Sequence, residues 1–230
     1  MEALKAKYQG KRCWIVGNGP SLAHTPLDEL QWEYCFGLNK ISMIFERTAW
    51  RPSFLVSTTT DLQDSNYRAE VERGIQSSYR GFVDGTAWPE NKRLPENAYR
   101  LNCSQSEALK AADGQDDFWS DDPTERVSKF GSTILPAFQL AAWMGFTHIY
   151  LVGCDLGYRS FGDGGDLNHF TADYYPTGAI EDGENAAMIR AHEIAAVNCK
   201  RLGVEIYNAT IGGELEVHSR IDFQQVLNDR

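Results

Sequence analysis

The feature that most constrains this chain of 230 residues is a short apolar run, Cys13–Val16, that breaks into the turn Gly17-Asn18-Gly19-Pro20-Ser21. An apolar run of this length followed by glycines predicts a buried strand of an α/β sheet and the loop that leaves it. In such a loop, a backbone without side chains can approach a phosphate, and the N–H groups that follow point toward it. We therefore expect residues 17–21 to form part of a ligand site.

The same glycines have a simpler interpretation, because any turn from a strand to a helix can require positive φ angles. Two standard nucleotide motifs are absent from this stretch. The third glycine of a dinucleotide fingerprint would fall at Leu22, and the second strand leads to Asn39, where an NAD site would carry a carboxylate. No Gly-Lys-Ser or Gly-Lys-Thr string of a P-loop occurs. The loop therefore suits a phosphate, but not in the usual manner of NAD or P-loop proteins.

The length and the 42% hydrophobic content predict a single α/β domain over residues 1–230. No apolar segment approaches the length that crosses a bilayer, and the first residues lack the apolar region of a signal peptide. The five cysteines include no Cys-x-x-Cys pair, which favours reduced core thiols over a zinc site. These features predict a cytoplasmic protein without a membrane span, and they leave a homo-oligomer open.

A formal net charge of -10 argues against nucleic acid as a partner, because an extended nucleic-acid surface needs a basic stripe. A small anionic ligand remains compatible with this charge when local N–H groups and hydroxyls bind it. The expected ligands are therefore small molecules.

The rest of the chain alternates apolar strands with helical patterns, which is typical of a parallel sheet. Further strands are expected at 34–38, 54–57, 99–101, 148–155 and 204–208, and helices at 62–75, 134–144 and 184–202. Two loop-rich segments, near 104–128 and 156–182, are expected to form a lid over the carboxyl ends of the strands.

Polar residues follow the third expected strand, at Thr60 and Asp61. Open α/β folds place ligands at this edge of the sheet, which makes both residues candidates for the nucleotide site. An acidic residue here is also an ordinary helix N-cap, and capping of the helix 62–75 is the favoured role for Asp61.

A second polar group, Gly131-Ser132-Thr133, precedes the buried helix at 134–144. The N–H groups at the amino end of a helix hold anions. The apolar strand that follows this helix ends in Asp155. We expect both groups of residues at the ligand site.

Together these blocks resemble the bacterial sialyltransferases of glycosyltransferase family 42, in Ile15–Leu22, Gly37–Asn39, Gly131–Thr133, Ile149–Asp155 and His169-Phe170. The same pattern resembles the MptE-like proteins, a group named for an archaeal 6-hydroxymethylpterin pyrophosphokinase. The resemblance implies a Rossmann-like, mostly parallel sheet with helices on both faces. It further implies a nucleotide-activated sugar as donor and a glycan or small molecule as acceptor.

The resemblance also implies roles for individual residues. Asn18 and Asn39 would hold the nucleotide, and Ser132 would bind the donor sugar. His169 would be the general base, while Tyr158 and Tyr174 would steady the departing phosphate. The remaining residues expected at the nucleotide site are Gly17, Gly19, Pro20, Ser21, Thr60, Asp61, Gly131, Thr133 and Asp155.

These roles are chemically consistent, because glycosyl transfer needs a base for the acceptor hydroxyl and donors for the leaving phosphate. Histidine titrates in the right range, and N–H groups near Gly19 and Ser21 could replace a metal. A loop histidine that merely bonds a carbonyl is the simpler reading of His169. Two other functions stay open. One is a pyrophosphokinase, with Mg²⁺ held by Asp61 and Asp155, and the other is a nucleotide-binding module without chemistry.

Overall fold

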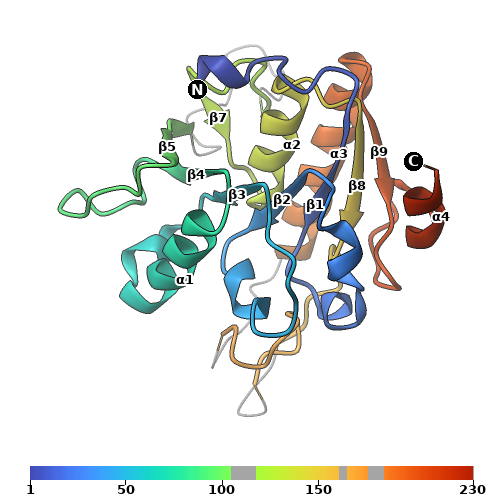
Figure 1. Cartoon of the computed structure of the whole chain (residues 1–230), viewed down its shortest axis with the longest axis horizontal. Helices are drawn as coiled ribbons and strands as arrows, with labels where there is room; N and C mark the ends of the chain where they lie inside the picture. The colour runs from blue at the N-terminus through green and yellow to red at the C-terminus, as the bar shows by residue number, and fades with distance from the viewer. Residues whose placement is uncertain (105–117, 161–164, 176–183, 230) are drawn as a thin grey trace.

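The computed structural model describes residues 1–104, 118–160, 165–175 and 184–229. Its centre is an eight-stranded sheet in which every neighbouring pair of strands is parallel (Figure 1). In spatial order the strands are β10 (Ser219–Arg220), β9 (Glu205–Asn208), β8 (His148–Val152), β1 (Arg12–Val16), β2 (Cys35–Leu38), β3 (Phe54–Ser57), β4 (Arg80–Asp84) and β5 (Ala98–Leu101). A separate short pair joins β6 (Cys103–Ser104) to β7 (Val127–Ser128).

Helices cover both faces of this sheet, because successive residues of each strand point to opposite sides. In β1, Cys13 and Ile15 pack under α2 (Ile134–Trp143) and α3 (Glu184–Arg201). Trp14 and Val16 belong to the core on the opposite face, which also includes residues of α1 (Ser65–Gln76) and α4 (Phe223–Asn228). The predicted Rossmann-like α/β fold with helices on both faces is therefore confirmed.

The chain before α1 also contains short 3₁₀ helices. These are η1 (Glu2–Leu4), η2 (Pro20–His24), η3 (Leu27–Leu30), η4 (Ile41–Ile44) and η5 (Thr60–Gln63). The helix expected from residue 62 begins only at Ser65, because Asp64 caps it by accepting from the N–H groups of Asn66 and Tyr67 at 2.9 and 2.8 Å. The expectation that Asp61 caps this helix is therefore wrong.

The order of the strands places a topological switch point beside β1. The chain leaves β1 for β2 on one side, and β8 pairs with β1 on the other side. Open α/β sheets bind ligands in the crevice outside such a point, at the carboxyl ends of the strands. The loops after β1 and β8 meet there, so the topology predicts a ligand site at this edge of the sheet.

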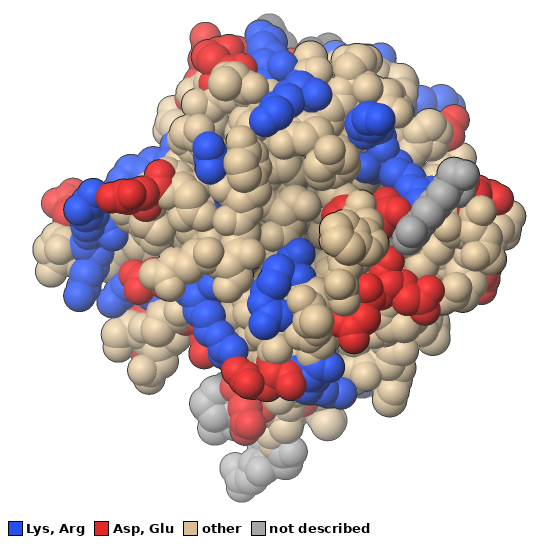
Figure 2. Space-filling model, viewed as in Figure 1, with Lys and Arg blue, Asp and Glu red and all other residues tan. Residues whose placement is uncertain are grey.

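Within the described ranges, no helix combines the length and the apolar character that a bilayer crossing requires. On the face shown in Figure 2, lysine and arginine side chains lie among acidic and uncharged ones. That face carries no continuous basic stripe of the kind that binds nucleic acid.

Candidate active site

A pocket opens at the carboxyl edge of the sheet, beside the switch point. Nine of the residues predicted for the site line it, from five separate parts of the chain: Gly17, Asn18, Asn39, Ser132, Thr133, Asp155, Tyr158, His169 and Tyr174. The other six predicted residues are not among its lining: Gly19, Pro20, Ser21, Thr60, Asp61 and Gly131. The predicted residues thus mark this pocket, although six of them do not line it.

The glycine turn after β1 is pressed against the loop after β8. The N–H groups of Gly17 and Gly19 donate to the carbonyls of Val152 and Gly153, both at 2.8 Å. A Cβ on Gly19 would lie 1.9 Å from Oδ2 of Asp155. The glycines are therefore required by this close approach of two loops, and the N–H group of Gly19 is not free to hold a phosphate as expected.

Asp155 clamps the same turn through Ser21. Its carboxylate accepts from the backbone N–H of Ser21 at 3.1 Å and from the Ser21 hydroxyl at 2.8 Å. Burial raises the pKa of Asp155, against the lowering effect of these hydrogen bonds. The expected phosphate donor at Ser21 is thus already used, and the Asp155 carboxylate holds the turn in place.

Replacing Gly19 with alanine is expected to destabilise the fold by about 2 kcal/mol or more, because the new methyl group overlaps Asp155. Urea unfolding followed by circular dichroism measures this change. Gly203→Ala is the control, since its new Cβ meets nothing within 4 Å and only its φ of +73° is unfavourable. Equal effects of the two substitutions would contradict the close approach at the turn.

The two asparagines of the pocket present complementary groups. Asn18 is buried and its Nδ2 donates to the carbonyl of Leu38 at 3.0 Å, while its Oδ1 has no hydrogen-bond partner among the described residues. Asn39 adopts the left-handed conformation, with φ of 49°, directly after β2. Its Oδ1 accepts from Ser57 at 3.0 Å and from Thr133 at 3.2 Å. This leaves its Nδ2 as a donor on the pocket wall.

The segment before α2 contributes Ser132 and Thr133 to the pocket wall, but Gly131 lies against α3. A Cβ on Gly131 would lie 2.2 Å from the carbonyl oxygen of Ala187, and its φ is +71°. Gly131 therefore allows the segment to approach α3 and places Ser132 at the pocket.

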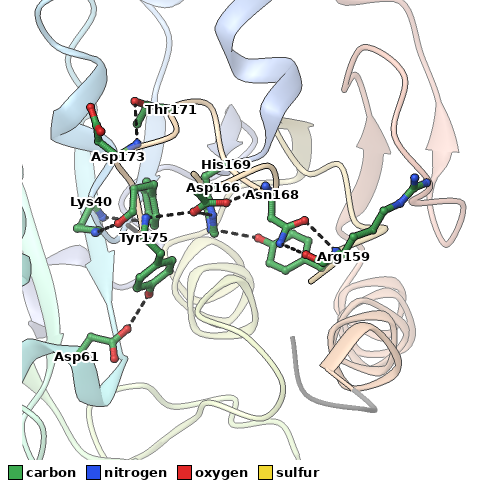
Figure 3. A network of polar contacts seen from close by, with 11 residues as sticks. Lys40, Asp61, Arg159, Asp166, Asn168, His169, Thr171, Asp173 and Tyr175 are labelled. Atoms are coloured by element: carbon green, nitrogen blue, oxygen red, sulfur yellow. Dashed lines mark hydrogen bonds and ion pairs between the residues drawn. The ribbon is translucent and has the colours of Figure 1, made fainter. Parts of the chain in front are cut away.

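His169 lines the pocket and belongs to a network of polar contacts (Figure 3). Its Nδ1 lies 2.7 Å from Oδ2 of Asp166, and its ring stacks on Tyr174 with centroids 4.0 Å apart. Its Nε2 lies 3.4 Å from the hydroxyl of Tyr158. Since a carboxylate can only accept, Nδ1 carries the proton and Nε2 is left with its lone pair.

Asp166 was not predicted from the sequence. Its side chain is fully buried and also accepts from the N–H groups of Asn168 at 2.7 Å and Tyr175 at 3.1 Å. The only signal in the sequence is its position three residues before His169, in a loop rich in aspartate and glycine. Burial lowers the pKa of His169 and outweighs the opposing effect of Asp166. The imidazole is therefore neutral near pH 7, as a general base must be.

Tyr158 is held in place by α3. Its backbone N–H donates to Asn185 at 2.9 Å, and its carbonyl accepts from the Asn185 amide at 2.8 Å. Burial raises the pKa of its hydroxyl, so this hydroxyl stays protonated and can donate a hydrogen bond.

The two polar residues after β3 lie apart from the pocket lining. Thr60 is exposed, and Asp61 accepts from the hydroxyl of Tyr175 at 2.7 Å (Figure 3). Asp61 therefore contacts the site only through Tyr175, which does line the pocket.

Residues 165–175, which are part of the second predicted lid, pack against the glycine turn. The N–H of Phe170 donates to the carbonyl of Asn18 at 2.9 Å. Trp119, Ser120 and Asp121, from the first predicted lid, instead line a second cavity beside Thr147 and Val204, at the amino ends of β8 and β9. The rest of the two predicted lids includes residues 105–117, 161–164 and 176–183, which lie outside the described residues.

His192 also lines the pocket and forms a buried pair with His218, with 3.0 Å between Nδ1 and Nε2. Burial lowers the pKa of His192 to about 3 and that of His218 to about 4. Both rings are therefore neutral in the folded protein over the range in which the unfolded chain binds protons.

This pair predicts a loss of stability in acid. Because the unfolded chain binds more protons below about pH 6.5, the contribution of each histidine is complete above that pH. It is lost as the pH falls toward about 4 for His218 and about 3 for His192, with a slope of about 1.4 kcal/mol per pH unit for each ring. Urea unfolding at several pH values measures the slope, and His218→Gln is expected to reduce it, whereas the exposed His24→Gln is not. An unchanged slope in His218→Gln would contradict this assignment.

Comparison with known proteins begins from the fold, because no protein-family model and no curated protein matches the sequence. Among solved structures, MAf glycosyltransferase from Magnetospirillum magneticum AMB-1 aligns with 95% of this chain at a TM-score of 0.55 and 14% identity. The chain spans 34% of the length of that protein.

Two sialyltransferases align less well. The monofunctional α-2,3-sialyltransferase Cst-I from Campylobacter jejuni matches 86% of this chain and 75% of its own, with a TM-score of 0.45 and 17% identity. A variant of the sialyltransferase Cst-II, in complex with CMP, matches 92% and 89%, with a TM-score of 0.43 and 14% identity. The chain therefore shares its fold with one part of a glycosyltransferase, MAf, across nearly its whole length.

Proposed function

We propose that this protein is a glycosyltransferase whose donor is a sugar activated by a nucleoside monophosphate, of the CMP-sialic acid type. The acceptor is a hydroxyl of a glycan or small molecule. The observation that carries the proposal is the His169 imidazole, oriented by buried Asp166 and facing the same pocket as Asn18 and Asn39. The fold shared with MAf glycosyltransferase agrees with it.

The reaction would be a direct displacement at the anomeric carbon. Nε2 of His169 takes the proton of the acceptor hydroxyl while the oxygen of that hydroxyl bonds to the anomeric carbon. The bond from this carbon to the phosphate oxygen breaks, and the nucleoside monophosphate leaves with the electron pair. Asp166 stabilises the imidazolium that forms, and the Tyr158 hydroxyl donates to the departing phosphate.

The pocket chemistry favours a donor with one phosphate. No lysine or arginine is among the lining residues that the structure describes, so binding of the phosphate relies on neutral donors. Oδ1 of Asn18, which has no partner among the described residues, and Nδ2 of Asn39 offer one acceptor and one donor to the base or the ribose. A buried acceptor without a partner is costly, and a ligand donor would satisfy it.

The alternative pyrophosphokinase would need Mg²⁺ on Asp61 and Asp155, and these residues do not fit a shared metal. Asp155 accepts twice from Ser21, while Asp61 accepts from Tyr175 and does not line the pocket. Among the described residues, no group of three or more His, Cys, Asp or Glu side chains is arranged to hold a metal ion. Asp61 and Asp155 therefore do not fit the role of shared Mg²⁺ ligands.

Thermal unfolding in the presence of CMP, CDP, UDP, GDP and ATP, in one series with EDTA and in a second with Mg²⁺, tests the proposal. CMP is expected to raise the melting temperature without a metal, because a ligand at 100 times its Kd stabilises a protein by about 2.7 kcal/mol. Asn39→Ala should weaken this effect, while the exposed control Asn91→Ala should not. Stabilisation by ATP with Mg²⁺ alone, or by no nucleotide, would contradict the proposal.

A further inference from the structure

Lys40 is a buried cation beside the candidate site that the mechanism above does not use. It follows Asn39 at the carboxyl end of β2, its residue exposure is 8%, and it is not among the lining residues of the pocket. Its Nζ lies over three tyrosine rings, at 4.8 Å from the centroid of Tyr67, 4.4 Å from Tyr174 and 4.6 Å from Tyr175. Burying a lysine is costly, so its surroundings must compensate.

Lys40 holds Tyr174 at both of its ends. The Nζ of Lys40 donates to the backbone carbonyl of Tyr174, and the backbone N–H of Lys40 donates to the Tyr174 hydroxyl at 3.3 Å. The Tyr174 ring is in turn parallel to the His169 ring, within 3° and with centroids 4.0 Å apart. Lys40, which follows β2, thus contacts the tyrosine on which the imidazole stacks. Figure 3 draws Lys40 and His169 in the same network of polar contacts.

Within the described residues, the loop that carries His169 has other contacts to this side of the site besides those of Lys40. The N–H of Phe170 donates to the carbonyl of Asn18, the Tyr175 hydroxyl donates to Asp61, and the Tyr175 ring stacks on Tyr67 with centroids 6.3 Å apart. The loop has no regular secondary structure over 165–175, so side-chain contacts set its position. Removing the Lys40 contacts would free the tyrosine and the ring stacked on it.

We propose that Lys40 is a positioning residue, which fixes Tyr174 and through it the plane and direction of the His169 imidazole. The role in catalysis rests on the proposed function, but the positioning itself does not. Lys40 acts on His169 indirectly, through the Tyr174 ring, because His169 lines the pocket and Lys40 does not.

The charge of Lys40 also affects the pKa of His169, and this effect provides a second measurement that tests the proposal. Asp166, Tyr158, Tyr174 and Tyr175 face the His169 ring directly. Of the charged side chains in this surrounding, Asp166 raises the pKa of His169, and the Lys40 cation lowers it. His192 lines the same pocket from α3 and is neutral. Removal of the Lys40 charge should therefore raise the pKa of His169.

The test uses carbon–proton NMR of the histidine rings in the full chain, with His169→Gln to assign the His169 signal. In Lys40→Met, which keeps the apolar stem but not the charge, the pKa of His169 should rise. The upfield ring-current shift from the stacked Tyr174 should shrink as well. Lys40→Arg restores the charge and should recover part of both effects.

Lys7→Met is the matched control, because Lys7 also lies over two tyrosine rings, Tyr8 and Tyr79, but at the surface before β1. Thermal unfolding of each variant verifies that the protein is folded. An unchanged pKa and ring-current shift in folded Lys40→Met would overturn the proposal, as would equal changes in Lys7→Met. These NMR readouts need no substrate, so their failure is distinguishable from failure of the proposed function, which the nucleotide-binding test detects.

Discussion

Replacing His169 with glutamine is expected to lower kcat by about 10²–10⁴-fold while leaving the donor affinity nearly unchanged. The reason is that, among the described residues, His169 is the only pocket side chain whose ring is held at Nδ1 by a buried carboxylate and stacked on a tyrosine, and this arrangement leaves Nε2 with its lone pair. Glutamine keeps a polar group of similar reach but cannot take up the acceptor proton. Initial rates of CMP release from a CMP-activated sugar, together with calorimetric binding of CMP, measure the two quantities.

His24→Gln is the matched control, because His24 is exposed on η2 and outside the pocket lining. This variant should keep the activity of the unmodified protein. If His169→Gln binds CMP and also retains full turnover, His169 has no role in proton transfer. If neither protein turns over any activated sugar, the nucleotide-binding module without chemistry becomes the better description.

Asp166→Asn is expected to have the second largest effect, a fall in kcat of about 10²-fold or more. The asparagine amide can present a donor to Nδ1, and this would move the imidazole proton to Nε2, where the base is needed. The loss of a carboxylate that accepts from Asn168, His169 and Tyr175 should also destabilise the loop. A pH–rate profile and urea unfolding separate the two consequences.

Asp173→Asn offers a control in the same loop, since Asp173 is exposed. It should change neither kcat nor the unfolding free energy by much. If Asp166→Asn keeps the full rate, the tautomer of His169 does not limit the reaction. This result would contradict the assignment of His169 as the base and Asp166 as the carboxylate that orients it.

The pattern of apolar segments predicted six of the eight strands of the sheet, but not β4 or the two-residue β10. A buried strand appears in the local sequence as a short apolar run, and Phe54–Ser57 was therefore predicted with its observed bounds. Helix starts were less accurate, because Asp64 competes with Asp61 for the capping role and only the three-dimensional path of the chain decides between them.

The site was predicted only in part, for a physical reason. The conspicuous residues Asn18, Asn39 and His169 do line one pocket. The tasks of Gly19 and Ser21, however, depend on the loop after β8, which is more than 130 residues away in sequence, at Asp155. Local sequence does not reveal whether an N–H group meets a ligand or another loop. The same limit hid Asp166 and Lys40, whose importance comes from the rings and donors that surround them.

The most direct test of the central claim is a crystal structure of the protein with bound CMP. The account predicts the nucleotide in the pocket between Asn18, Asn39 and Ser132, with its phosphate at hydrogen-bond distance from the Tyr158 hydroxyl and on the side of the His169 imidazole. Binding of CMP in the other cavity, beside Trp119 and Trp143, would contradict it.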